Sequence, residues 1–165
     1  MIYDVRTERL PMSALFSLQG AKEAVDPWAG GVLPAFPQTP NTFTDRDGRQ
    51  LLWIGAETWL LRAPIEQENT LLADLRPADA PEDISIVCVS DTLAFWRIDG
   101  EEADQIISIG SPLDVHPSVF PDTAATWTEC FGQRALIQRV PGGFDLAVDR
   151  SYAPMFDDYL ARITA

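Results

Sequence analysis

The single histidine of the chain, His116, stands two residues after Asp114 in the segment Pro112–Pro117. An Asp–His pair is a candidate for general-base chemistry when a nucleophile lies within hydrogen-bond reach. However, the serines of the chain include no Gly-x-Ser-x-Gly elbow. Prolines flank the pair, and in turn-rich segments a carboxylate or an imidazole commonly caps backbone amides. We therefore expect a structural role for Asp114 and His116.

The other residues with chemical potential form no recognisable site. Cys88 and Cys130 are far apart and have no Cys-x-x-Cys partner, so a tetrahedral zinc site is not expected, and we interpret both as buried thiols. The Gly30-Gly31 and Gly142-Gly143 pairs lack the spacing of a dinucleotide-binding loop. Neighbouring carboxylates are interpreted as solvated surface charge; they occur at Asp45/Asp47, Glu82/Asp83, Glu101/Glu102 and Asp157/Asp158. The sequence predicts no catalytic, cofactor-binding or metal-binding residue.

Five tryptophans are available for packing or for contact with another molecule. Trp53, Trp59 and Trp96 lie in predicted strands, and we expect them in the core. Trp28 lies at the end of a predicted short helix beside a loop, which makes it the best candidate for an interface residue.

Charge and hydropathy exclude several classes of protein. Twenty-five acidic residues oppose twelve basic ones, giving a formal net charge of −13. Such a surface repels nucleic acid and anionic membranes. No apolar run approaches the roughly 20 residues that span a bilayer. Met1–Leu10 is charged and has no apolar core segment, so no signal peptide is expected. These features predict a cytoplasmic protein.

The sequence contains an approximate internal repeat. Leu15–Gly20 is an apolar strand ending in glycine, followed by a predicted helix at 21–29; Phe95–Gly100 repeats this pattern before a predicted helix at 101–109. Two-strand patterns at 50–62 and strand patterns at 124–148 follow, and each half closes with a helix, at 65–76 and at 152–163. The sequence thus predicts an α+β fold, one compact domain over 1–165. Its halves, about 12–76 and 84–164, are similar, with a duplicated, ferredoxin-like β-α-β-β-α order.

The sequence also predicts several local features. The apolar run Ile84–Ser90 predicts a central strand covered on both faces. Residues 35–48 are predicted as a mobile loop with an Asp47-Gly48 turn, and 76–83 as the connector between halves. Glycine at Gly30 or Gly110 is expected to cap the preceding helix. Ser151 is the expected N-cap of the last helix, with Pro154 in its first turn.

Three blocks of the sequence resemble the gamma subunit family of the heterotetrameric sarcosine oxidases. They are the hairpin Leu52–Leu61, the most specific block Ser111–Pro121 (SPLDVHPSVFP), and Phe144–Ala153 (FDLAVDRSYA). The resemblance covers about Leu15 to the C-terminus. It departs from the usual pattern at Ala56–Thr58 and at Asp122.

The resemblance implies a fold related to the folate-binding domain of aminomethyltransferases. It also implies partner subunits, alpha, beta and delta, with alpha the first expected contact. FAD, FMN, NAD, tetrahydrofolate and zinc would be carried by those other subunits. The complex would oxidise sarcosine to glycine, with hydrogen peroxide and formaldehyde or methylenetetrahydrofolate, and this chain would contribute assembly without catalytic residues of its own. Two alternatives stay open: a free-standing folate-binding or one-carbon transfer protein, and a homo-oligomeric interaction module.

Overall fold

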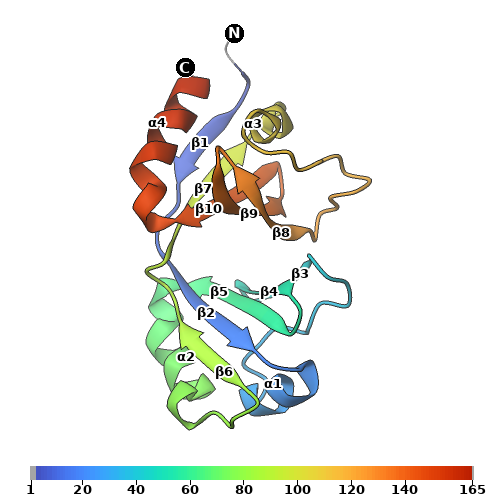
Figure 1. Ribbon diagram of the computed structural model, residues 1–165, viewed down its shortest axis with the longest axis vertical. Helices are drawn as coiled ribbons and strands as arrows, with labels where there is room; N and C mark the ends of the chain where they lie inside the picture. The colour runs from blue at the N-terminus through green and yellow to red at the C-terminus, as the bar shows by residue number, and fades with distance from the viewer. Residues whose placement is uncertain (1–2, 165) are drawn as a thin grey trace. The chain divides into compact units, whose positions relative to one another are not determined.

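A computed structural model describes residues 3–164 (Figure 1). The chain forms two compact units. We call Met12–Asp91 the first unit; the second unit consists of the segment up to Pro11 and the residues from Thr92 onward. Each unit contains one five-stranded sheet in which all neighbouring strands are antiparallel.

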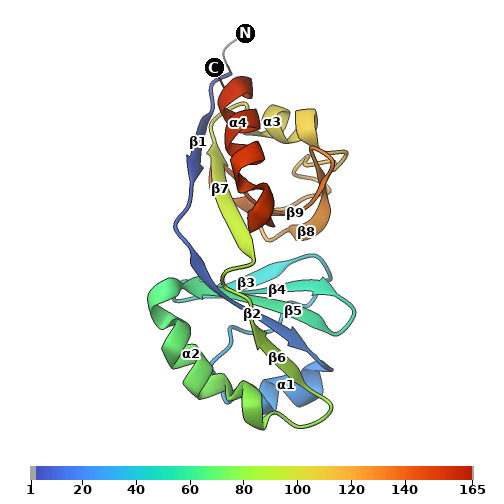
Figure 2. The same ribbon diagram turned by 60° about the vertical axis from the view of Figure 1, so that its left-hand side comes forward.

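The first unit places its strands in the order β3-β4-β5-β2-β6. Its elements are β2 (Ser13–Gln19), α1 (Lys22–Ala29), β3 (Phe43–Arg46), β4 (Arg49–Gly55), β5 (Thr58–Pro64), a short 3-10 helix (Ile65–Gln67), α2 (Glu68–Leu75), a second 3-10 turn (Pro77–Asp79) and β6 (Ser85–Cys88). The two helices cover one face of the sheet (Figure 2). The core there includes Phe16, Val25, Leu51, Leu61 and Leu71, all with no exposed surface. Alternation along the strands directs Phe16, Leu51 and Leu61 to one face, and the helices contribute Val25 and Leu71.

The second unit has the strand order β1-β7-β10-β9-β8. Its elements are β1 (Arg6–Arg9), β7 (Leu93–Asp99), α3 (Ala103–Gly110), β8 (Ala125–Cys130), β9 (Gln133–Val140), β10 (Gly143–Asp149), a 3-10 turn (Arg150–Tyr152) and α4 (Ala153–Ile163). Ala153, Phe156 and Leu160 form the buried face of α4, at the spacing of successive helical turns. They pack with Trp96 and Leu146 of the sheet in a single core.

The two units repeat one topology. Beginning from the edge that carries β3 or β8, strands β3, β4, β5 and β2 correspond to β8, β9, β10 and β7. The fifth strand is exchanged between the repeats: β1 precedes β2 but pairs with β7, and β6 precedes β7 but pairs with β2. Each repeat therefore supplies the edge strand of the other repeat's sheet.

The predicted α+β class is confirmed. The predicted β-α-β-β-α order has three strands in each half, whereas each sheet has five. Residues 43–46 of the expected mobile loop form β3 and pair with β4 across Asp47-Gly48. Both turn residues have positive φ, 56° and 79°, as a tight hairpin turn of that type requires. The predicted single domain with halves at 12–76 and 84–164 stays a prediction.

Three other local predictions are wrong. The segment 84–90 contributes an edge strand, β6, in which Ile86 is buried and Val87 is 51% exposed. An apolar run is compatible with a central strand and also with an edge strand that packs one face on the core, so the run alone does not distinguish the two. Ser151 does not cap α4: its backbone N–H and hydroxyl donate to Asp149, which caps the preceding 3-10 turn. Gly110 is the last residue of α3 and has no positive φ.

The expected cap at Gly30 is confirmed, since its φ of 58° places it in the left-handed conformation after α1. A packing contact explains Gly110 instead. A Cβ there would lie 2.6 Å from the Phe131 ring, so the glycine lets this ring approach the end of α3. None of the described helices is long and apolar enough to cross a membrane.

Candidate functional site

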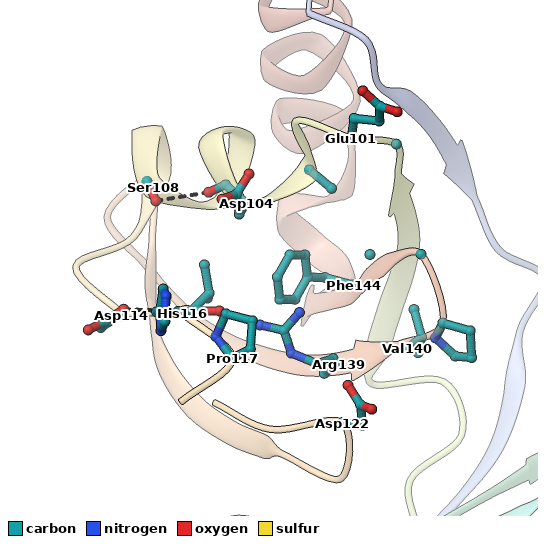
Figure 3. A pocket seen from close by; sticks show the side chains of 16 residues that line it. Glu101, Asp104, Ser108, Asp114, His116, Pro117, Asp122, Arg139, Val140 and Phe144 are labelled. Atoms are coloured by element: carbon teal, nitrogen blue, oxygen red, sulfur yellow. Dashed lines mark hydrogen bonds between the residues drawn. The ribbon is translucent and has the colours of Figure 1, made fainter. Parts of the chain in front are cut away.

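The second unit contains a cavity of about 720 Å³ (Figure 3). Its walls come from the start of α3, from the turn between β9 and β10, and from the loop that joins α3 to β8. Val115, Pro117, Val140 and Phe144 supply the apolar part of the lining. The second and third of the family-like blocks found in the sequence, Ser111–Pro121 and Phe144–Ala153, thus meet at one place.

Arg139, near the end of β9, fastens this loop to the sheet. Its Nε donates to the Phe120 carbonyl at 2.7 Å, and Nη2 donates to the Val115 carbonyl. The guanidinium also lies over Phe144, 4.7 Å from the ring centroid, and 5.7 Å from that of Phe120. Cation–π and charge-assisted hydrogen bonds both favour this arrangement. Arg139 was not singled out from the sequence, because its partners are carbonyls 19 and 24 residues away.

His116 and Asp114 do not form a catalytic dyad. The Asp114 carboxylate accepts from the backbone N–H of His116 at 2.9 Å, which confirms the predicted capping role. His116 Nδ1 accepts from the backbone N–H of Ser118 at 3.2 Å and lies 2.7 Å from its hydroxyl. Accepting from an N–H requires a lone pair, so in the neutral ring the proton sits on Nε2. These contacts shape the tight loop at the cavity rim.

Acidic groups dominate the rim. The exposed side chains of Glu101 and Asp104 lie at the start of α3, and those of Asp114 and Asp122 lie on the loop opposite (Figure 3). Arg139 is the single arginine or lysine among the described residues that line the cavity. Within the described part of the chain, no three His, Cys, Asp or Glu residues lie close enough together to hold a metal ion.

The first unit has a smaller cavity, of about 290 Å³, at the corresponding place. It lies beside the start of α1 and the β4–β5 turn, and Trp53 and Trp59 line it. Their rings are 5.0 Å apart. Lys22, also a lining residue, lies 5.7 Å from the ring centroid of Phe36.

The tryptophans mainly serve packing. Trp59 and Trp96 are buried, as predicted, whereas Trp53 is half-buried at the edge of the core. Trp28, the expected interface residue, is engaged within the first unit. Its Nε1 donates to the Leu75 carbonyl at 2.8 Å, and the Arg76 guanidinium stacks 4.1 Å from its ring centroid. The structure therefore assigns Trp28 to the junction of α1 and α2.

The two cysteines differ in their surroundings. Cys130 is buried, as predicted; burial, reinforced by the charge of Glu129, raises the pKa of its thiol to about 12. A thiol with such a pKa stays protonated and unreactive at neutral pH. Cys88 is only half-buried, contrary to the prediction, because it lies on edge strand β6. Its Sγ lies 3.4 Å from the Ser90 hydroxyl.

Some carboxylates predicted as surface charge have structural partners. The Glu102 carboxylate accepts a hydrogen bond from the Asp4 backbone N–H at 2.7 Å. Asp157 on α4 accepts from Trp96 Nε1 at 2.8 Å and pairs with Arg9 at 3.0 Å. It thereby joins α4 to β7 and β1. Asp158 has the expected surface role and pairs with Arg162 one helical turn later.

Solved structures share this fold. A chain of the heterotetrameric sarcosine oxidase from Corynebacterium sp. U-96, in complex with pyrrole 2-carboxylate, matches with a TM-score of 0.81 at 20% identity; the match covers 98% of this chain and 86% of that one. The glycine cleavage system aminomethyltransferase T from Bartonella henselae matches with a TM-score of 0.70 at 13% identity over 96% of this chain. The chain spans 46% of that aminomethyltransferase. The predicted relationship to the aminomethyltransferase fold is confirmed.

No curated protein sequence matches the chain. The model of the sarcosine oxidase, gamma subunit family matches residues 38–165, which include all three blocks that first suggested it. The chain belongs to the sarcosine oxidase gamma subunit family.

Proposed function

We propose that this chain is the non-catalytic gamma subunit of a cytoplasmic, heterotetrameric sarcosine oxidase-like complex. The complex would demethylate sarcosine oxidatively to glycine, with hydrogen peroxide and formaldehyde or methylenetetrahydrofolate as the other products. Alpha, beta and delta subunits would be its partners, with alpha the first contact, and FAD, FMN, NAD, tetrahydrofolate and zinc would be held by those subunits. The family match over residues 38–165 carries this proposal.

The contacts of the family-like blocks support the non-catalytic part of this proposal. In Ser111–Pro121, the Ser111 hydroxyl accepts from the Leu113 backbone, and Asp114 accepts from the His116 backbone. In the third block, Arg150 Nη2 donates to the Leu93 carbonyl at 3.2 Å. These polar side chains fix the loop and the end of β10. They do not converge on a reacting centre, as an acid, a base and a nucleophile would have to do.

Purification from the native cells tests the proposal. The tagged chain should bring down three further subunits, and the eluate should show flavin absorbance and form peroxide when sarcosine is added. An untagged extract is the control for non-specific capture. A colourless eluate containing this chain alone would contradict the assembly role, as would sarcosine oxidation by the isolated chain with added flavin.

A second candidate function, folate binding by the free chain, draws support from the aminomethyltransferase-like fold and the 720 Å³ cavity. The charge at the cavity rim weighs against it. Folates carry a glutamate tail with two carboxylates, and Glu101, Asp104, Asp114 and Asp122 would repel that tail. Titration with tetrahydrofolate, followed by tryptophan fluorescence, distinguishes the candidates: saturable quenching at micromolar concentration would favour folate binding.

A further inference from the structure

The loop at residues 114–121, in the second unit, combines an exposed apolar tip with a fixed backbone. Val119 is 60% exposed, the highest value among the large apolar side chains of the described residues. Pro117 and Pro121, on either side of it in the sequence, are also exposed. Single exposed apolar residues are common on soluble proteins, so exposure alone does not indicate an interface. The hydrogen bonds of the loop supply the further evidence.

From His116 onward, every backbone N–H of this loop is bonded within the loop itself. His116 donates to the Asp114 carboxylate at 2.9 Å, and Ser118 donates to His116 Nδ1 at 3.2 Å. Val119 and Phe120 both donate to the His116 carbonyl, at 3.0 and 2.9 Å. The two remaining positions are prolines, which have no backbone N–H. The tip therefore carries no backbone donor that depends on water.

A loop that stays in solvent does not need such bonds, because water satisfies its N–H groups. A loop that loses its water on docking does need them, since a donor left unpaired in an apolar setting weakens binding about tenfold. Arg139 also fixes the loop from the sheet by donating to the Val115 and Phe120 carbonyls. The loop is thus ordered before it binds, which lowers the entropic cost of association.

From these observations we propose that the tip of this loop, formed by Pro117, Val119 and Pro121, inserts into an apolar pocket of a partner subunit. Val119 is the anchor. The exposed carboxylates of Asp114 and Asp122 stand at the two ends of the loop, so the rim of that pocket carries basic side chains. A second copy of the chain is a poor occupant, because each copy carries a net charge of −13. The inference rests on the proposed assembly role.

A competition experiment in the native cells tests the inference. Wild-type chain and the variant Val119→Asp carry different tags and are co-expressed, and their ratio in the purified complex measures relative incorporation. A carboxylate in place of the anchor should lower incorporation about tenfold or more, because burying an unpaired charge in an apolar pocket is strongly unfavourable. The matched control is Val87→Asp, which changes another exposed valine, on β6 of the first unit, and should be incorporated like wild type.

A second pair of variants tests the contribution of the fixed backbone. His116→Ala removes the acceptor of the Ser118 N–H and should lower incorporation about threefold or more. His116→Asn supplies an acceptor again, because an asparagine oxygen bonds the N–H two residues later, and should recover most of the loss. Hydrogen exchange at the Ser118 amide of the free chain should accelerate in His116→Ala only. Equal incorporation of His116→Ala and wild type would contradict the role of the fixed backbone.

The outcomes separate this inference from the function on which it rests. If the wild-type chain forms no complex, the assembly role itself fails. If it assembles and Val119→Asp is incorporated as well as Val87→Asp, the docking inference is wrong while the assembly role stands. A free wild-type chain that sediments as a dimer, with Val119→Asp as a monomer, would make a second copy the occupant and also overturn the inference. Thermal unfolding checks each variant. Should Val119→Asp be unstable, Val119→Ser and Val87→Ser replace the pair, with about a threefold difference expected.

Discussion

The two units place different side chains at equivalent strand positions beside their cavities. In the first unit, the ring of Trp53 faces Trp59, and Phe36 meets Trp59 edge-on at 4.8 Å. In the second unit the corresponding strand positions hold Arg139 and Phe144, and Phe120 lies 6.4 Å from Phe144. The flat guanidinium takes the place of an indole on the aromatic ring.

The difference shows how the same strand topology can leave a small cavity in one unit and a larger cavity in the other. In the first unit, Trp53 and Trp59 fill most of the space beside the β4–β5 turn and leave a cavity of about 290 Å³. In the second unit the long Arg139 side chain donates hydrogen bonds to carbonyls of the loop. The loop and the sheet together line a cavity of about 720 Å³. Swapping residues between equivalent positions therefore tests which differences matter for folding and which for the cavity.

The largest effect is expected at Gly143, whose equivalent in the first unit is Thr58. A Cβ at Gly143 would lie 2.0 Å from the Ile98 carbonyl oxygen, in the backbone of the neighbouring strand. Gly143→Thr should lower the free energy of unfolding by about 3 kcal/mol or more, because β7 and β10 would have to separate. Urea denaturation measures the loss. The control Gly142→Ala meets no neighbouring atom within 4 Å, although its φ of 80° adds backbone strain. Equal losses in the two variants would rule out the close approach as the cause.

A smaller effect is expected from the buried Asp145. Its carboxylate accepts from Arg97 across the strand pair, and this contact raises the pKa of Arg97. The corresponding residues of the first unit are Leu60 and Ser17. Asp145→Leu should cost about 2 kcal/mol, since it leaves the Arg97 guanidinium, 32% exposed, without this partner.

The double swap Asp145→Leu/Arg97→Ser should recover most of that loss, because it removes both charges and recreates the pair of the first unit. Urea midpoints of the two single variants and the double variant complete the cycle. Additive losses in the double variant would show that the pair does not act as a unit.

Next in size is the exchange of the two stacked residues. Arg139→Trp should cost about 1.5 kcal/mol, because the bonds to the Phe120 and Val115 carbonyls are lost while the stack on Phe144 is kept. The reverse change, Trp53→Arg, should cost about 1 kcal/mol through loss of the contact with Trp59. Thermal unfolding provides both values. A larger loss for Trp53→Arg than for Arg139→Trp would contradict the fastening role of Arg139.

The parts of this fold that sequence predicted are those with local signals. Gly30 caps α1, and the turn at Asp47-Gly48 lies where the sequence suggested, because turn and cap conformations depend on adjacent residues. Alternating apolar residues marked most strands for a similar reason. Asp114 was correctly interpreted as a cap, since its partner amide is two residues away.

Features that depend on distant residues were not predicted. The exchange of β1 and β6 is a matter of strand partners, and an apolar run such as Ile84–Ser90 does not say whether it lies at the centre or the edge of a sheet. The cavity depends on Arg139 reaching carbonyls on a separate loop. A single arginine in a strand gives no signal of such contacts. The family resemblance identified the blocks but not the cavity that two of them line.

The smallest expected effect concerns the end of β5 before the 3-10 helix that leads into α2, and the equivalent end of β10 before the 3-10 turn that leads into α4. Pro64 occupies this position in the first unit, and Asp149 occupies it in the second. Hydrogen bonds from the Ser151 hydroxyl, at 2.6 Å, and the Ser151 backbone N–H, at 2.9 Å, lower the pKa of Asp149. A carboxyl group whose pKa is lower in the folded state stabilises that state above its unfolded pKa, about 3.9, and loses this effect as the pH falls through the folded value.

Asp149→Asn keeps an oxygen that can accept from Ser151 and removes only the charge. The wild type should therefore be slightly more stable than the variant at pH 6, and the difference should shrink steadily as the pH falls below about 4. Urea midpoints at closely spaced pH values measure this difference, and Asp74→Asn, an exposed change on α2, serves as the control. A difference that stays constant between pH 6 and pH 3 would mean that the cap works through geometry alone.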